Sequence, residues 1–123
     1  CRIAVGVRDK WNGQGTAVVS ERACDHVILT DEDPYDEDPR TIVDEMAAGM
    51  QRKPQIIMDR RRAIRVGIEY AHSHSTKESD PYAVLVTGKG TDPFIMRAHN
   101  KRESWSDKAV AEEETKKMLG ASR

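Results

Sequence analysis

Six acidic residues stand within eight positions, at 31–38. The last three, at 36–38, precede a helical pattern, and carboxylates there are favoured by the positive end of the helix that follows. The first three, at 31–33, repel one another and need a counter-charge, which a cationic ligand or Mg²⁺ could supply. The spacing of a calcium-binding EF-hand loop is absent, because Tyr35 and the neighbouring prolines replace its glycine turn. An ammonium group on a ligand is therefore the favoured partner.

Two other loops carry groups that could hold an anion or approach a ligand closely. In the loop at 7–15, Arg8 could grip a carboxylate or phosphate with two hydrogen bonds, or it could pair with Asp9 at the surface. In the loop at 88–93, glycines could let the backbone pass close to a ligand, or could form an ordinary turn. The Gly-x-x-x-x-Gly-Lys-Ser/Thr pattern of a phosphate-binding P-loop is absent from the chain.

The sequence does not indicate a metal site, a catalytic triad or a disulfide framework. The four histidines are scattered, and His72 and His74 would lie on different sides of a helix, so we expect no metal site. No Ser-His-Asp order, nucleophile elbow or zinc spacing occurs. Cys1 and Cys24 are too few for a disulfide framework, and we expect both to be reduced thiols.

Short apolar runs alternate with helical patterns, and these elements must position the loops. Four runs predict buried strands, at 3–7, 26–30, 55–58 and 82–87. Asp38 and Asp59 are expected to cap helices over 39–50 and up to position 71, and a weaker helical pattern covers 16–24. A polar connection is expected at 72–81, a hairpin at 94–104 and a last helix from about 107 to 119.

This order of elements predicts an α/β fold: a Rossmann-like, mainly parallel sheet flanked by helices, with a C-terminal β-hairpin and helix. Open parallel sheets bind ligands at the carboxyl ends of their strands, where loops and helix N-termini gather. The loops at 7–15, 31–38 and 88–93 each follow a predicted strand. We expect them to meet at one edge and to hold a small zwitterion together.

Length and charge narrow the class of protein. The 123 residues contain no internal repeat and predict a single domain, 1–123. With 20 basic against 21 acidic residues, the net charge of −1 disfavours a nucleic-acid partner. No apolar run is long enough for a membrane span, and the first residues do not resemble an export signal. We expect a cytoplasmic protein with no membrane partner.

Four segments match short family motifs in order and rough spacing. Residues 31–39 resemble an Asp-Asn-Pro-Arg region, and 8–10 a Gly-Asp-Arg-Asp-Lys loop. Residues 59–64 resemble an Asp-Arg-x-x-Ala-Ile helix start, and 88–92 a Gly-Lys-Gly-His-Glu turn. Together they resemble the Mur ligases that add the third amino acid to UDP-N-acetylmuramoyl-dipeptide, and the resemblance spans nearly the whole chain.

The resemblance implies the C-terminal domain of a three-domain, ATP-dependent amide ligase of peptidoglycan synthesis. Its partners would be an amino acid, UDP-N-acetylmuramoyl-dipeptide and the central ATPase domain of the same polypeptide. ATP and Mg²⁺ would be bound mainly by that central domain, which is absent from this sequence, as is the N-terminal domain. The C-terminal domain would present the amino acid, whose amine attacks an acyl phosphate. We expect no catalytic residue in this chain and no turnover by the chain alone.

By position, the resemblance also implies a substrate site. Arg8 would hold the carboxylate of the amino acid, and Lys10 is a candidate for the cofactor. Five further positions complete the substrate site: Glu32, Asp33, Tyr35, Gly88 and Asp92.

One departure from the family pattern bears on the amino acid. Tyr35 stands where enzymes that use meso-diaminopimelate have Arg, so the fork for that substrate's second carboxylate is missing. Acids at 32, 33 and 92 fit a side-chain ammonium, which favours lysine or ornithine over diaminopimelate.

Two other functions remain open. A stand-alone Rossmann-like module could bind an amino acid or nucleotide without catalysis, and it would then have no upstream P-loop domain. A folylpolyglutamate or cyanophycin-type ligase domain would use glutamate or an acidic polymer, which the acid-rich loop would repel.

Overall fold

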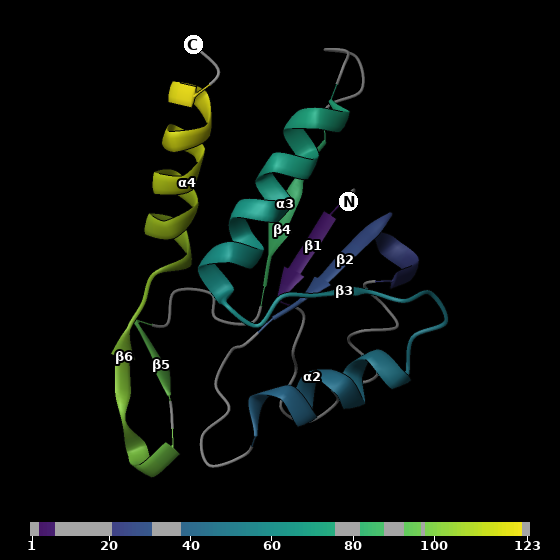
Figure 1. Ribbon diagram of the computed structural model, residues 1–123, viewed down its shortest axis with the longest axis vertical. Coiled ribbons are helices and arrows are strands. Elements are labelled where there is room, and N and C mark those ends of the chain that lie inside the picture. Colours follow the sequence, from purple (N-terminus) through teal and green to yellow (C-terminus); the bar gives the residue numbers. More distant parts are fainter. Residues whose placement is uncertain are drawn as a thin grey trace.

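The computed structural model of the chain describes residues 3–6, 21–30, 38–75, 82–87, 93–96 and 98–121 (Figure 1). Four strands form one parallel sheet in the order β3-β2-β1-β4. Their bounds are Ile3–Gly6 for β1, His26–Leu29 for β2, Gln55–Ile56 for β3 and Val84–Val86 for β4. The first strand of the chain therefore lies in the interior of the sheet, with Ile3 opposite both His26 and Val84.

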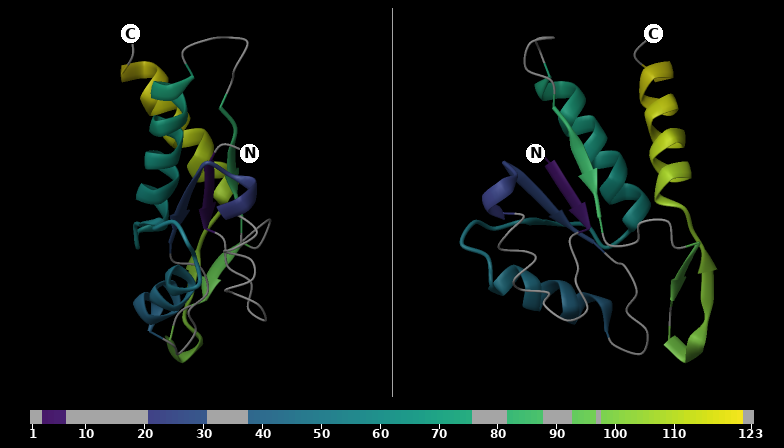
Figure 2. Two further views of the ribbon diagram at one scale, coloured as in Figure 1. Left: turned by 90° about the vertical axis from the view of Figure 1, so that its right-hand side faces the viewer. Right: turned by 180° about the vertical axis from the view of Figure 1, so that it is seen from behind.

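Helices cover both faces of this sheet because successive residues of the buried strands point to opposite sides. On one face Ile3 and Val5 pack with apolar residues of α3 (Arg60–His74) and α4 (Asp107–Ala121). On the other face Ala4 packs with apolar residues of α2 (Pro39–Ala48). Helices α3 and α4 run side by side (Figure 2). The predicted α/β fold is confirmed.

The two expected helix caps, Asp38 and Asp59, are present, and α4 is capped as well. The Asp38 side chain accepts a hydrogen bond from the backbone N–H of Arg40 at 3.0 Å, and the proline stands in the first turn of α2. The Asp59 side chain accepts from the N–H of Arg62 at 3.3 Å at the start of α3. Ser106 accepts from the N–H of Ala109 at 3.1 Å at the start of α4. Each cap satisfies a donor that the first turn leaves unpaired.

Helix α3 is longer than expected, so the prediction that 72–81 is a polar connection was wrong for its first three residues. Ser73 Oγ donates to the carbonyl of Glu69 at 2.6 Å, and His74 Nδ1 lies 2.8 Å from the carbonyl oxygen of Tyr70. The His74 ring also stacks on Tyr70, with ring centroids 3.9 Å apart. Polar side chains that bond to the preceding turn continued the helix instead of ending it.

The C-terminal part follows the expectation. Strands β5 (Phe94–Met96) and β6 (Arg102–Ser104) pair in antiparallel fashion, with Phe94 opposite Ser104. A short 3₁₀ turn, Ala98–Asn100, connects them. In the region of the weaker helical pattern, residues 21–23 are helical and 16–20 lie outside the described part.

The expectation that both cysteines are free thiols was wrong for Cys24, which is disulfide-bonded. The number of cysteines and their spacing along the chain did not reveal this bond.

Candidate functional site

The carboxyl ends of three neighbouring strands lie side by side at one edge of the sheet. Gly6 at the end of β1 is opposite Leu29 at the end of β2, and Val5 is opposite Val86 at the end of β4. The loops predicted to hold a ligand begin after these three strand ends. Helices α3 and α4 also begin at this edge (Figure 1).

The predicted site residues themselves lie outside the described part of the chain, so their placement stays a prediction. These residues are Arg8, Lys10, Glu32, Asp33, Tyr35, Gly88 and Asp92.

A buried arginine connects the elements that meet at this edge. Arg60, the first residue of α3, is 3% exposed. Its Nε and Nη2 donate to the two carboxylate oxygens of Asp107, each at 2.8 Å. Nη2 also donates to the backbone carbonyl of Thr87 at 3.0 Å, directly after β4. Trp105 Nε1 donates to Asp107 Oδ1 at 2.6 Å. We call Arg60, Thr87, Trp105 and Asp107 the Arg60 cluster.

The two parallel hydrogen bonds between Arg60 and Asp107 offset the cost of burying this ion pair. Removing two charges from water is costly, and only excellent geometry with further hydrogen bonds offsets that cost. The paired bonds of Arg60 to Asp107 and the additional Trp105 donor meet this condition. The carboxylate also lies in the first turn of α4, where the helix dipole favours a negative charge.

Gly6 allows the ends of β1 and β4 to come this close. Its φ is +103°, and a Cβ atom at this position would lie 2.2 Å from the carbonyl oxygen of Thr87 and 3.2 Å from Arg60 Nη1. The backbone N–H of Thr87 donates to the carbonyl of Val5 at 2.9 Å. Thr87 is therefore held through its N–H by β1 and through its carbonyl by Arg60.

Sequence reasoning missed the Arg60 cluster, although one signal was available. The first turn of α3 contains no acidic residue and begins with three arginines, 60–62, against the preference set by the helix dipole. Arginines in this position indicate dedicated acidic partners. The structure supplies them from α4.

The second of these arginines makes a separate link between the same two helices. Arg61 Nη2 lies 2.8 Å from Glu113 Oε2, and Arg61 Nη1 donates to Glu114 Oε1 at 3.0 Å. Glu114 is 2% exposed, and its Oε2 has no hydrogen-bond partner among the described residues. Burial would raise the pKa of Glu114, but the hydrogen bond from Arg61 and the charges of Lys117, Arg61 and Arg65 outweigh it and hold that pKa below its ordinary value.

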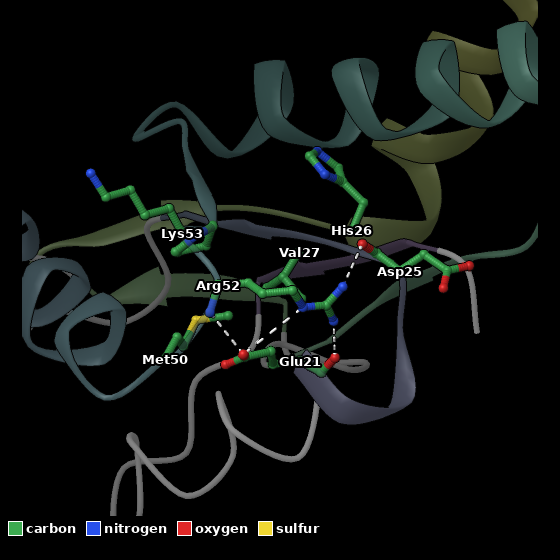
Figure 3. A pocket seen from close by; sticks show the side chains of 8 residues that line it. Glu21, Asp25, His26, Val27, Met50, Arg52 and Lys53 are labelled. Carbon is green, nitrogen blue, oxygen red and sulfur yellow. Dashed lines mark hydrogen bonds and ion pairs between the residues drawn. The ribbon is translucent and has the colours of Figure 1, made fainter.

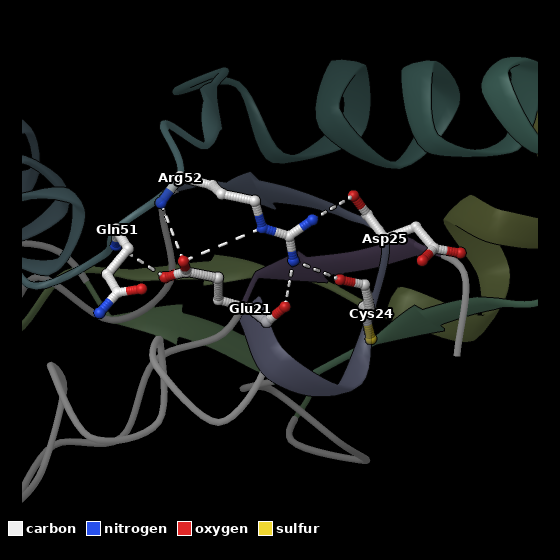
Figure 4. A network of polar contacts seen from close by, with 5 residues as sticks. All are labelled: Glu21, Cys24, Asp25, Gln51 and Arg52. Carbon is white, nitrogen blue, oxygen red and sulfur yellow. Dashed lines mark hydrogen bonds and ion pairs between the residues drawn. The ribbon is translucent and has the colours of Figure 1, made fainter.

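A polar network at the opposite, amino edge of the sheet has a structural explanation. The Glu21 carboxylate accepts from the backbone N–H groups of Gln51 and Arg52, at 2.9 and 2.8 Å (Figure 4). The Arg52 guanidinium donates to the carbonyls of Glu21, Cys24 and Asp25. These bonds cap the end of the helical turn at 21–23.

The same network borders a cavity of about 140 Å³ (Figure 3). It lies beside His26, the first residue of β2, and so at the edge away from the predicted loops. Its central charged groups, Glu21 and Arg52, already hold backbone partners. We therefore assign the candidate site to the carboxyl edge.

The described residues do not fit a bound Mg²⁺ ion. They contain no group of three or more His, Cys, Asp or Glu side chains that could hold a metal. In the same part of the chain, no helix is long and apolar enough to cross a membrane.

Comparison with known proteins assigns the chain to a family. Residues 3–90 match the family described as "Mur ligase, glutamate ligase domain". The chain belongs to this family. A relative from Vibrio vulnificus, "UDP-N-acetylmuramoyl-L-alanyl-D-glutamate--2,6-diaminopimelate ligase", is 32% identical over 117 residues, which is 95% of this chain and 22% of that protein. The corresponding L-lysine ligase of Streptococcus thermophilus is 41% identical over 81 residues, 66% of this chain and 15% of that protein.

A solved structure named as a diaminopimelate ligase of the same type shares the fold. It matches 95% of this chain and 24% of its own chain, with a TM-score of 0.68 and 22% sequence identity. The resemblance to Mur ligases is thus confirmed. This chain spans 22% and 15% of the two relatives' lengths, and these relatives use different amino acids.

Proposed function

We propose that the chain is the amino-acid-presenting, C-terminal domain of an ATP-dependent ligase of peptidoglycan synthesis. The ligase would add the third amino acid to UDP-N-acetylmuramoyl-dipeptide. The family match over residues 3–90 carries this proposal. It is supported by relatives named as ligases acting on UDP-N-acetylmuramoyl-L-alanyl-D-glutamate. An N-terminal domain and a central ATPase domain would belong to the same polypeptide.

The proposed role of the chain is to bind and orient the amino acid. Arg8 would hold its carboxylate, while Asp33 and Asp92 would hold its side chain. This leaves the α-amine free, in its neutral form, to attack the acyl carbon. The central domain would bind ATP with Mg²⁺, and ATP would supply the phosphoryl group that converts the dipeptide carboxylate to an acyl phosphate, with ADP as the second product. The amide bond forms as phosphate leaves and the amine loses a proton.

We propose lysine or ornithine as the substrate in preference to meso-diaminopimelate. Tyr35 provides no cation for a second carboxylate, and the acids at 32, 33 and 92 attract a side-chain ammonium. In the test, this chain replaces the matching C-terminal segment of a lysine ligase and, in a second hybrid, that of a diaminopimelate ligase. Both hybrid enzymes should show a higher kcat/KM for lysine or ornithine, whichever parent supplied the other domains. Preference for diaminopimelate in both hybrids would refute the assignment.

A substitution in the same hybrids tests the reason for the preference. Tyr35→Arg restores a two-point partner for a carboxylate and should raise kcat/KM for diaminopimelate relative to lysine, by roughly tenfold. Tyr35→Phe is the matched control, because it changes the side chain without adding a charge. Equal effects of the two substitutions would contradict the charge argument.

We propose that the chain alone does not turn over ATP. Its sequence contains no P-loop pattern to hold the nucleotide phosphates. Release of phosphate from ATP by the purified chain, surviving removal of contaminating ATPases, would disprove this part of the proposal.

A further inference from the structure

The Arg60 cluster lies at the carboxyl edge of the sheet and joins the start of α3, the end of β4 and the start of α4. Arg60 begins α3, Thr87 follows β4, and Trp105 and Asp107 lie at the start of α4. Gly6 at the end of β1 packs against the same Thr87 carbonyl. The segment at 88–92, which contains two of the proposed substrate-binding residues, begins at the next position along the chain.

We propose that Arg60 and Asp107 are positioning residues for the proposed amino-acid site, because together they hold Thr87, the residue that directly precedes the proposed substrate-binding residue Gly88 in the sequence. This inference rests on the proposed function. Neither residue needs to touch the substrate for this role. They act through the carbonyl of Thr87, to which Arg60 donates at 3.0 Å.

The geometry requires arginine at this position. One planar guanidinium gives two parallel bonds to Asp107, and its Nη2 also reaches Thr87. Lysine has a single ammonium on a flexible stem and cannot reproduce the fixed fork. The orientation of the Asp107 carboxylate is in turn set by the Trp105 donor. A displacement of α4 would therefore be transmitted to Thr87.

A purely stabilising role is the alternative, and the neighbouring arginine provides the control for it. Arg61 lies on the same helix and also connects α3 to α4, through Glu113 and Glu114. Arg61 is bonded to residues of α4, whereas Arg60 is bonded both to α4 and to the residue that follows β4. Both arginines should contribute to docking of α4, and Arg60 should in addition affect the amino-acid site.

The experiment uses a complete hybrid ligase that carries this chain as its C-terminal domain. Steady-state kinetics compare Arg60→Lys with Arg61→Lys while the amino acid, ATP and UDP-N-acetylmuramoyl-dipeptide are varied in turn. We expect Arg60→Lys to raise KM for the amino acid by roughly tenfold to a hundredfold, since small misplacements of positioning groups have effects of this size. The KM values for the other two substrates should change by less than about twofold, as should all values for Arg61→Lys.

A second variant, Asp107→Asn, tests the same inference if Arg60→Lys does not fold. Asp107→Asn keeps the shape of the side chain and one carbonyl oxygen for Trp105, but it removes the charge. We expect it to raise the same KM in the same direction. An unchanged KM for the amino acid in Asp107→Asn, or in folded Arg60→Lys, would overturn the inference.

Hydrogen exchange separates this inference from the proposed function. In the hybrid protein, peptides spanning 84–92 should exchange faster in Arg60→Lys than in Arg61→Lys, whether or not the hybrid is active. An unsubstituted hybrid that ligates none of lysine, ornithine and diaminopimelate counts against the proposed function alone. Equal exchange of these peptides in both variants counts against the positioning role alone.

Discussion

Replacing three glycines by alanine, one at a time, tests how tightly the ends of β1 and β4 are packed. A Cβ at Gly6 would lie 2.2 Å from the Thr87 carbonyl oxygen, whereas ordinary contacts begin at 3.4 Å, so the carbonyl would have to retreat by about 1.2 Å. That movement breaks the bond from Arg60 and adds the strain of φ at +103°. Together these effects should lower the free energy of unfolding by about 3 to 5 kcal/mol.

The other two glycines give a graded comparison. A Cβ at Gly67 in α3 would lie 2.9 Å from Val5 Cγ2, so Gly67→Ala trades crowding of about 1 to 3 kcal/mol against a gain in helix propensity of about 1 kcal/mol. At Gly120 in α4 nothing lies within 4 Å, and Gly120→Ala should stabilise the domain by up to about 1 kcal/mol.

The assay is equilibrium urea unfolding of each variant, followed by far-ultraviolet circular dichroism. The expected order of stability is Gly120→Ala, then the unsubstituted protein, then Gly67→Ala, with Gly6→Ala lowest. A Gly6→Ala variant as stable as the unsubstituted protein would refute the close approach of β1 and β4. The hydrogen bond from Arg60 to the Thr87 carbonyl would then be refuted as well.

Two further predictions concern charged groups. The pKa of Glu114 is lower in the folded than in the unfolded state, so this residue contributes stability above its ordinary pKa of 4.5 and loses it as the pH falls towards its folded value. Urea midpoints between about pH 3 and 6 should therefore fall more steeply in the unsubstituted protein than in Glu114→Gln, and equal slopes would contradict the assignment. Arg52→Ala removes the donor to three carbonyls and should cost about 1 to 2 kcal/mol, because the side chain is 60% exposed, while Lys53→Ala at the next position should stay within about 0.5 kcal/mol. Equal urea midpoints for these two variants would show that the Arg52 network contributes nothing to stability.

The predictions that succeeded rest on local patterns. Apolar runs bounded by polar residues located the four strands, and Asp38 and Asp59 marked two helix starts through a bond to the backbone two or three residues away. Such signals are contained within a few positions of the chain. The end of α3 was misjudged because polar residues after Ala71 bond to the preceding helical turn, which polarity alone does not reveal.

The Arg60 cluster could not be found in this way, because its members come together only in the folded chain. Arg60 and Asp107 are 47 positions apart, and Thr87 lies between them on another element. The motif at 59–64 indicated only a helix start. The convergence of the three strand ends, in contrast, follows from the general geometry of parallel sheets and was predictable.

The interior place of β1 has a consequence for how the chain folds. During synthesis β1 and β2 can pair early, but the other side of β1 must wait for β4, since Ile3 meets Val84 about 80 residues later. Until then β1 is an edge strand, whose unpaired backbone groups can form hydrogen bonds with an incorrect strand. The parallel sheet can therefore be completed only after β4 has been synthesised, because β4 covers the second side of β1.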